Sequence, residues 1–181
     1  MKASPQMPDF RTLFEKEYSY VRATARRLGI RERELPDLVH DVFVAVHRKL
    51  PEFDEQRPIR PWLFGITFRI VVGHKRRLGY RREQLSDDGE HDRPDEAPGA
   101  DQQMEEEERR RMFHEALETL DDDKRAVFVL HEIDEVPIPE IAIALQVPEN
   151  TAYSRLRLAR EQLRRSLTRL MARTNAKQVA S

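Results

Sequence analysis

The chain has 181 residues, of which 32 are Lys or Arg and 33 are Asp or Glu, and it contains no cysteine. Without cysteine it can form neither a disulfide framework nor a thiolate zinc site, which fits a reducing cytoplasm. The N-terminal segment MKASPQMPDF has no apolar core of signal-peptide length, and no apolar run approaches the roughly 18 residues of a membrane span. We therefore expect a cytoplasmic protein that does not associate with membranes.

The formal net charge of −1 conceals three blocks of different sign. Residues 1–82 carry a net charge of +8, residues 83–108 carry −11, and residues 109–181 carry +2, with +6 concentrated in residues 149–181. Acids, Gly and Pro dominate the middle block, which has almost no large apolar side chains. We expect two small helical domains, 1–82 and 109–175, joined by an acidic flexible linker at 83–108.

Three amphipathic helices are predicted in the first domain. Apolar residues recur at helical spacing from Phe10 until Gly29 ends the helix, namely Leu13, Phe14, Tyr18, Val21, Ala25 and Leu28. A second helix follows Pro36 and ends at Pro51, and a third starts near Pro61 and finishes on the basic segment 74–77. The segment between Pro51 and Pro61 should be a loop. Three helices of this kind can share one small core.

The second domain is also predicted to be helical. One helix begins in the acidic run 105–108 and continues to Leu120, and Asp121 or Asp122 can cap the next. No alternating strand pattern of convincing length and no internal repeat occurs in the sequence. The fold class is therefore all-α.

Residues 138–157, IPEIAIALQVPENTAYSRLR, have the pattern of a helix-turn-helix. Ala142 is small where the two helices would cross, Val147 fills the turn, and Pro148 or Glu149 opens the second helix. On that helix one continuous inward stripe is predicted, formed by Ala152, Leu156, Ala159, Leu163, Leu167 and Leu170.

The outer face of the second helix is polar and basic, which suits a helix placed in the major groove of DNA. We expect contacts to base edges or adjacent phosphates from Asn150, Thr151, Tyr153, Ser154, Arg155 and Arg157, and contacts to the DNA backbone alone from Arg160 and Arg164. The alternative is a helical hairpin whose basic face is simply solvated.

Three motifs together resemble regions 2 and 4 of the extracytoplasmic-function (ECF) sigma factors, a subfamily of the bacterial sigma-70 family. They are DLVHDVF (37–43), WLFGITFRIVVGHKRR (62–77) and EIAIALQVPENTAYSRLRLAREQL (140–163), in this order with an acidic segment between the last two. The resemblance implies a subunit that binds core RNA polymerase and directs promoter-specific initiation. Its first domain would melt and read the minus-10 element, and its helix-turn-helix would read the minus-35 element.

The resemblance also implies roles for residues of the first domain. The surface that grips the clamp helices of the large polymerase subunit corresponds to Asp37, Leu38, His40, Asp41 and Phe43, and the polymerase flap is a further expected partner. Minus-10 DNA would be held by Arg57, Arg60, Trp62, Phe64, Arg69, Lys75, Arg76 and Arg77. Melted DNA needs stacking surface and positive charge, although Trp62 taken alone is better explained as a core residue. Members of the family usually have an anti-sigma factor, which we expect as a partner here.

Three positions depart from the family pattern. Gln146 stands where a turn glycine is usual, so another residue must adopt that turn, with a positive φ as one possibility. His40 replaces a common glutamine, and Arg69 replaces a common asparagine. These changes do not alter the expected role as a sigma factor, but they leave undetermined which promoter sequence the chain prefers.

Other classes of function have less support in the sequence. No Walker loop, GxGxxG, GxSxG or HExxH motif occurs, so we expect neither an enzyme nor a cofactor. Asp37, His40 and Asp41 could face one metal ion, but such a trio on a helix is usually surface. A stand-alone helix-turn-helix regulator is the main alternative, and a purely structural adaptor is a third.

Overall fold

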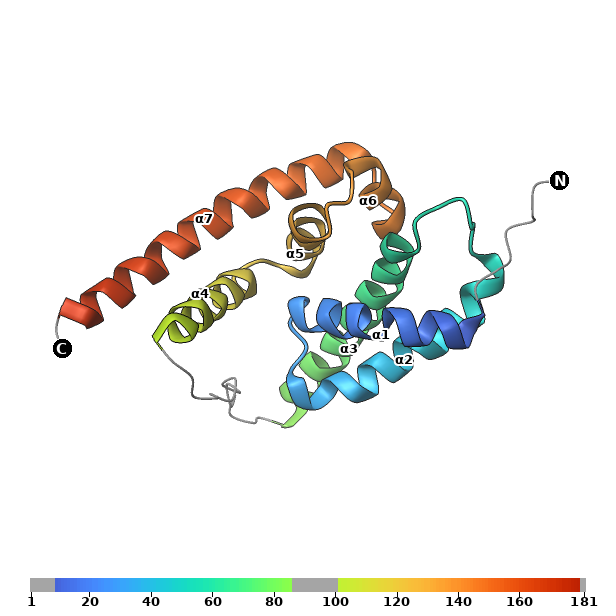
Figure 1. Ribbon diagram of the computed structural model, residues 1–181, viewed down its shortest axis with the longest axis horizontal. Helices are drawn as coiled ribbons and strands as arrows, with labels where there is room; N and C mark the ends of the chain where they lie inside the picture. The colour runs from blue at the N-terminus through green and yellow to red at the C-terminus, as the bar shows by residue number, and fades with distance from the viewer. Residues whose placement is uncertain (1–8, 86–100, 180–181) are drawn as a thin grey trace.

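The computed structural model describes residues 9–85 and 101–179, and every regular element in these two ranges is helical (Figure 1). This confirms the all-α fold class with two helical regions. None of the helices described is long and apolar enough to cross a lipid bilayer.

The N-terminal unit consists of α1 (Phe10–Arg27), α2 (Leu35–Lys49) and α3 (Ile59–Leu85), with short 3-10 turns at Glu32–Glu34 and Leu50–Glu52. Asp9 caps α1 by accepting a hydrogen bond from the Thr12 amide, and Gly29 follows the helix with φ +91°. The three predicted helices are therefore present. However, Phe14 and Tyr18, which we placed in the inward stripe of α1, are each 37% exposed.

The C-terminal unit consists of α4 (Asp101–Glu118), α5 (Asp122–Phe128), the π-helical turn η3 (Val129–Ile133), α6 (Ile138–Leu145) and α7 (Glu149–Val179). Asp121 caps α5 through its bond from the Lys124 amide at 2.8 Å, as predicted. The long helix α7 contacts α4, α5 and α6, so it is the support of this unit (Figure 1).

Helix extends into both ends of the segment that we expected to be a linker. α3 continues to Leu85, and α4 already begins at Asp101, so the expectation of a linker from 83 to 108 was too wide. Residues 105–108 are helical as predicted, but α4 begins earlier than predicted, at Asp101. Residues 86–100, which contain most of the expected linker, lie outside the described residues.

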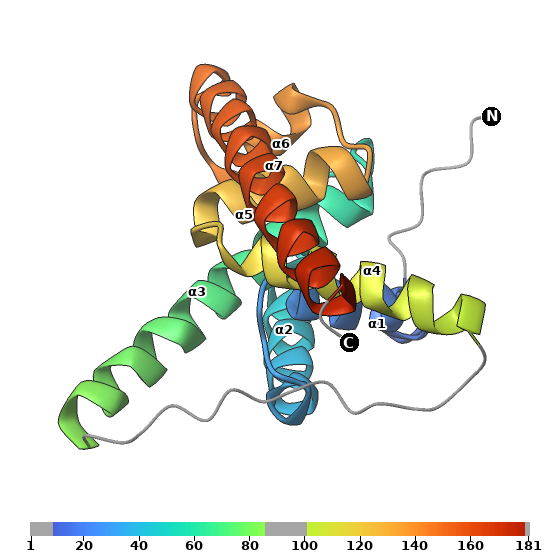
Figure 2. The same cartoon turned by 90° about the vertical axis from the view of Figure 1, so that its left-hand side faces the viewer.

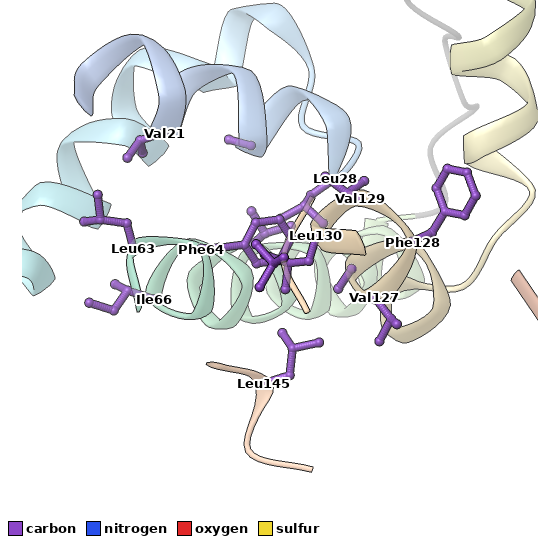
Figure 3. Packing of buried hydrophobic residues seen from close by; sticks show 14 of the residues in the cluster. Val21, Leu28, Leu63, Phe64, Ile66, Val127, Phe128, Val129, Leu130 and Leu145 are labelled. Atoms are coloured by element: carbon purple, nitrogen blue, oxygen red, sulfur yellow. The ribbon is translucent and has the colours of Figure 1, made fainter. Parts of the chain in front are cut away.

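The two units pack against each other, contrary to the expectation of two separate cores. α3 contacts α6, and the buried apolar residues of both units form one contiguous cluster. At its centre Phe64 of α3 points toward Leu28, which follows α1, and Leu130 of η3 (Figure 3). The last turns of α3 instead extend away from the C-terminal unit (Figure 2).

A polar junction lies beside this shared core. The Tyr20 hydroxyl of α1 donates to Asp134 Oδ2 at 2.7 Å, and Arg27 Nη1 lies 3.4 Å from Asp134 Oδ1. Burial raises the pKa of Asp134, although the bond from Tyr20 and the charges of Arg27 and Arg60 oppose the shift. Burial also raises the pKa of Tyr20, with the charge of Asp134 as the next cause, so its hydroxyl keeps the proton that it donates.

Replacing Asp134 by Asn tests the energetic role of this junction. A raised pKa in the folded chain means that the folded state binds the proton more tightly than the unfolded state. The free energy of unfolding should therefore fall as pH rises from about 3.8 through the folded pKa. Asp134→Asn keeps an oxygen acceptor for Tyr20 but cannot titrate, so its stability relative to the wild type should increase from pH 4 to pH 7. Urea unfolding across this range measures the difference, and a constant difference would contradict the expectation.

Candidate nucleic-acid interface

The helix-turn-helix is formed by α6, a tight turn and the start of α7. Gln146 ends α6 in the left-handed conformation with φ 58° and ψ 46°, which confirms that a residue other than Gly adopts a positive φ here. The turn is held by Val147, whose amide donates to the Ala142 carbonyl at 2.9 Å. Ala142 is 6% exposed, which suits its predicted place where the two helices cross. Val147 is half-buried and packs against the core, which suits its predicted place in the turn.

The first turns of α7 present a polar face to solvent. The predicted inward stripe is buried from Ala152 to Leu163, while Leu167 and Leu170 are half-buried. The opposite face exposes Tyr153 by 56%, and it continues with other exposed predicted contacts, Asn150, Ser154, Arg157, Arg160 and Arg164. Thr151 and Arg155 are half-buried at the edge of this face.

Two arginines of this face are held by acids of the same unit. Arg155 Nη2 lies 2.6 Å from Asp123 Oδ2, and Arg160 Nε lies 2.8 Å from Glu132 Oε1. The hydrogen bond from Arg160 lowers the pKa of Glu132, so this carboxylate is charged at neutral pH. These pairs orient both guanidinium groups, and DNA phosphate would have to compete with the acids for them.

The aromatic residues predicted to stack on melted DNA differ in accessibility. Trp62 is half-buried, with its ring 4.8 Å from the ring of Phe53. Phe64 is fully buried, because it lies in the shared core between the two units (Figure 3). In this arrangement Phe64 is not available to a base, so the expected stacking on this ring requires the units to separate.

The basic residues of α3 are partly occupied by the C-terminal unit. Arg69 Nη1 donates to the Ala144 carbonyl at 3.4 Å, while Lys75 Nζ lies 2.6 Å from Asp122 Oδ1 and 2.6 Å from the Leu28 carbonyl. Burial lowers the pKa of Lys75, and the bond to Asp122 opposes this shift. Arg76 and Arg77 are exposed. The predicted strand-binding charges therefore do lie along one helix, but two of the four have partners within the chain.

The two arginines near the start of α3 also have acidic partners. Arg57 Nε lies 3.4 Å from Asp54 Oδ2 within the loop. Arg60 Nε donates to the buried Glu17 carboxylate at 3.0 Å, and its guanidinium lies 5.0 Å from the centre of the Tyr20 ring. The side chain of Arg60 is therefore held by two residues of α1, although more than half of it is exposed to solvent.

On α2, only some of the residues predicted to bind the polymerase are accessible. Asp37, His40 and Asp41 are exposed, whereas Leu38 and Phe43 are 2% and 3% exposed. The buried pair supports the helix from inside and cannot present a contact surface unless the helix unpacks. Sequence reasoning missed Val44, which is 37% exposed one turn after His40.

An aromatic patch next to α2 was also missed. Phe14 and Tyr18 of α1 lie against Phe43, with ring centres 4.6 and 6.3 Å apart, and Phe10 packs on His47 at 4.8 Å. The exposure of Phe14 could have been inferred from its position directly after Leu13, because one stripe of a helix cannot bury two consecutive apolar side chains equally. Within the part of the chain described, no group of three His, Cys, Asp or Glu residues could hold a metal ion.

Comparison with known proteins assigns both units. Residues 13–80 match the family model for sigma-70 region 2, and residues 110–163 match the model for sigma-70, region 4. The RNA polymerase sigma factor CnrH of Cupriavidus metallidurans is 32% identical over 149 residues, which cover 77% of this chain and 76% of CnrH. The ECF RNA polymerase sigma factor SigE of Mycolicibacterium smegmatis is 29% identical over 170 residues, which cover 93% of this chain but 65% of SigE.

Two solved structures have a similar fold. The sigma factor RpoE of Bartonella quintana, crystallised with the anti-sigma factor NepR, aligns with a TM-score of 0.69 at 22% identity, over 88% of this chain and 97% of that one. The structure of CnrH in complex with the cytosolic domain of CnrY aligns with a TM-score of 0.60 at 28% identity, over 88% of this chain and 87% of that one.

The left-handed turn at Gln146 can be tested by substitution. A side chain in this conformation costs about 1 kcal/mol that Gly does not incur, so Gln146→Gly should stabilise the chain by up to about 1 kcal/mol. For a chain of this size the melting temperature should rise by about 2–4 °C. Gln146→Ala, which keeps the Cβ, should give no such gain. A Gly variant that is less stable than the wild type would contradict this account of the turn.

Proposed function

Since this chain belongs to the ECF subfamily of the sigma-70 sigma factors, we propose a division of its promoter contacts between the two units described above. As a sigma factor it directs promoter-specific transcription initiation by RNA polymerase. The observation that carries the proposal is that a region 2 match and a region 4 match occur in order along one chain. A stand-alone helix-turn-helix regulator would account for the second match but not for the first, so it is not favoured.

The C-terminal unit, 109–175, reads the duplex of the minus-35 element through the first turns of α7. Asn150, Tyr153, Ser154 and Arg157 are exposed on one polar face, where side chains can reach base edges in the major groove. Thr151 and Arg155 border this face. Arg160 and Arg164 lie further along the helix and are placed to contact phosphates.

The N-terminal unit, 1–82, handles the minus-10 element. The loop before α3 supplies Arg57, and α3 supplies Arg60, Trp62 and Phe64 together with the basic side chains Arg69, Lys75, Arg76 and Arg77. Aromatic rings bind unpaired bases by stacking, and the cations follow the phosphate backbone of the melted strand. Because Phe64 is buried against the C-terminal unit, full use of this surface requires the open arrangement of the two units.

The exposed face of α2 binds the core polymerase. Asp37, His40 and Asp41 provide polar contacts to the clamp helices of the large subunit, and the neighbouring patch of Phe14, Tyr18 and Val44 adds apolar area. Aromatic residues beside charged groups are a frequent composition of protein interfaces. Leu38 and Phe43 hold this face in shape from below. The polymerase flap is the proposed partner of the C-terminal unit.

An anti-sigma factor is a further proposed partner. The RpoE and CnrH structures that align with this chain hold NepR and the cytosolic domain of CnrY respectively. We propose a cytoplasmic location, because the partners RNA polymerase and promoter DNA are found there, and a chain without a catalytic site or cofactor of its own.

Charge reversal on α7 tests the reading of the duplex. Arg157→Glu combined with Arg160→Glu should lower promoter-directed run-off transcription with purified core polymerase by about tenfold or more, because two contacts to DNA become repulsive. Arg169→Glu makes the same kind of change on the exposed side of the same helix, three turns beyond Arg157, and should have little effect. Unchanged initiation by the double variant would refute the assignment of α7.

Charge reversal on α2 tests the polymerase contact. Asp41→Lys should raise the chain concentration needed for half-maximal run-off transcription by about tenfold, which corresponds to about 1.4 kcal/mol of binding free energy. Glu15→Lys, at an exposed acid of α1, is the control for the change in charge. Equal effects of the two variants would count against α2 as the specific contact.

A further inference from the structure

The C-terminal unit covers the face of α3 that carries the predicted strand-binding side chains. Phe64 is buried against η3, Arg69 donates to the Ala144 carbonyl, and Lys75 pairs with Asp122. Asp121, Asp122 and Asp123, the acidic triplet before and at the start of α5, line one shallow hollow together with Arg69 and Arg76. Each contact to a cation of α3 is thus made by an oxygen atom that carries a full or partial negative charge.

Two glycines allow this close approach. A Cβ on Gly65 of α3 would lie 2.4 Å from the Ala144 carbonyl oxygen, which is too close for any side chain. Gly29, with φ +91°, would place a Cβ 2.3 Å from Arg125 Nη1 and 3.2 Å from Lys75 Nζ. The carbonyl end of α6 and the start of α5 therefore reach the basic side of α3 because no side chains intervene.

The acidic triplet serves both predicted DNA surfaces. Asp121 caps α5, Asp122 binds Lys75 of the N-terminal unit at 2.6 Å, and Asp123 binds Arg155 of the helix-turn-helix at 2.6 Å. The Lys75 and Asp122 side chains are 28% and 37% exposed, so water and ions reach the pair. A carboxylate and a phosphate form the same charge-assisted bond with an ammonium or guanidinium group, and a partly exposed pair can be exchanged at small cost.

We propose that the start of α5 acts as an intramolecular substitute for DNA phosphate, in which Asp122 occupies Lys75 until the melted promoter strand displaces it. The inference rests on the proposed function of α3 as the strand-binding helix. The packed arrangement and the strand then exclude each other, and the apparent affinity of the free chain for single-stranded DNA equals the intrinsic affinity multiplied by the fraction of molecules that are open.

The first test measures binding of the full chain to a fluorescent single-stranded oligonucleotide by anisotropy at low salt. Asp122→Asn should bind about five to ten times more tightly than the wild type, because Lys75 becomes free for phosphate. Glu115→Gln is the matched control. It removes the same charge from the C-terminal unit, but Glu115 is exposed and its Oε1 lies 4.0 Å from Arg173 Nη1 of the same unit, so the affinity should change less than twofold.

A double-mutant cycle separates competition for Lys75 from a general change in charge. In a Lys75→Gln background, Asp122→Asn should no longer improve binding, because the cation that both ligands seek is gone. The proposal is overturned if Asp122→Asn binds like the wild type, if Glu115→Gln gains as much, or if the gain persists without Lys75.

The opening itself can be followed by fluorescence energy transfer, since the chain has no native cysteine to interfere with labelling. Labels on Arg48→Cys of α2 and Arg169→Cys of α7 should show lower transfer in Asp122→Asn, and lower transfer in the wild type when oligonucleotide is added. Constant transfer in both cases would refute the opening.

Run-off transcription tests the proposed function independently of oligonucleotide binding. At saturating chain, run-off transcription with core polymerase should be equal for the wild type and Asp122→Asn. Absence of transcription by the wild type would refute the proposed function. Normal transcription by the wild type, together with unchanged oligonucleotide binding by Asp122→Asn, would refute only the proposal that Asp122 substitutes for DNA phosphate.

Discussion

The contact of α3 with the segment from α5 to α6 determines the arrangement of the whole molecule. Gly65 lets the carbonyl end of α6 come against α3, and Phe64 enters a core that both units line. Full burial of one such ring is worth about 1.5–3 kcal/mol. Small helical units bury only part of their apolar surface alone, so packing them together adds stability that neither has by itself. The same contact covers side chains that we propose to bind the promoter strand.

The ion pairs at both proposed DNA surfaces are partly exposed, and among these pairs the one at Lys75 joins the two units. Lys75, Arg155 and Arg160 each pair with an acid of the C-terminal unit, but both members of each pair remain between 25% and 53% exposed. Ion pairs of this kind contribute about 1 kcal/mol or less. They orient the cations without holding them so strongly that phosphate cannot replace the acid. A net charge of −1 is therefore compatible with a DNA-binding role, because the positive charge is local.

Several features could be read from the sequence because they depend on neighbours in the chain. The cap at Asp121, the stop at Gly29 and the inward stripe of α7 follow from helix periodicity and end chemistry over a few residues. The positive φ at Gln146 was suggested by the family resemblance, because this residue stands where a turn glycine is usual. The family resemblance supplied the roles of the two units, which periodicity alone does not give.

The sequence by itself determined the helices, their inward faces and the order of two sigma-factor regions. Only the tertiary structure decided that the units share one core, that Phe14 and Tyr18 are exposed while Phe64 is buried, and that Lys75 and Asp134 find partners 47 and 114 residues away. The physical reason is that helical spacing fixes which side chains share a face, whereas the element that covers this face is chosen by long-range packing of the whole chain.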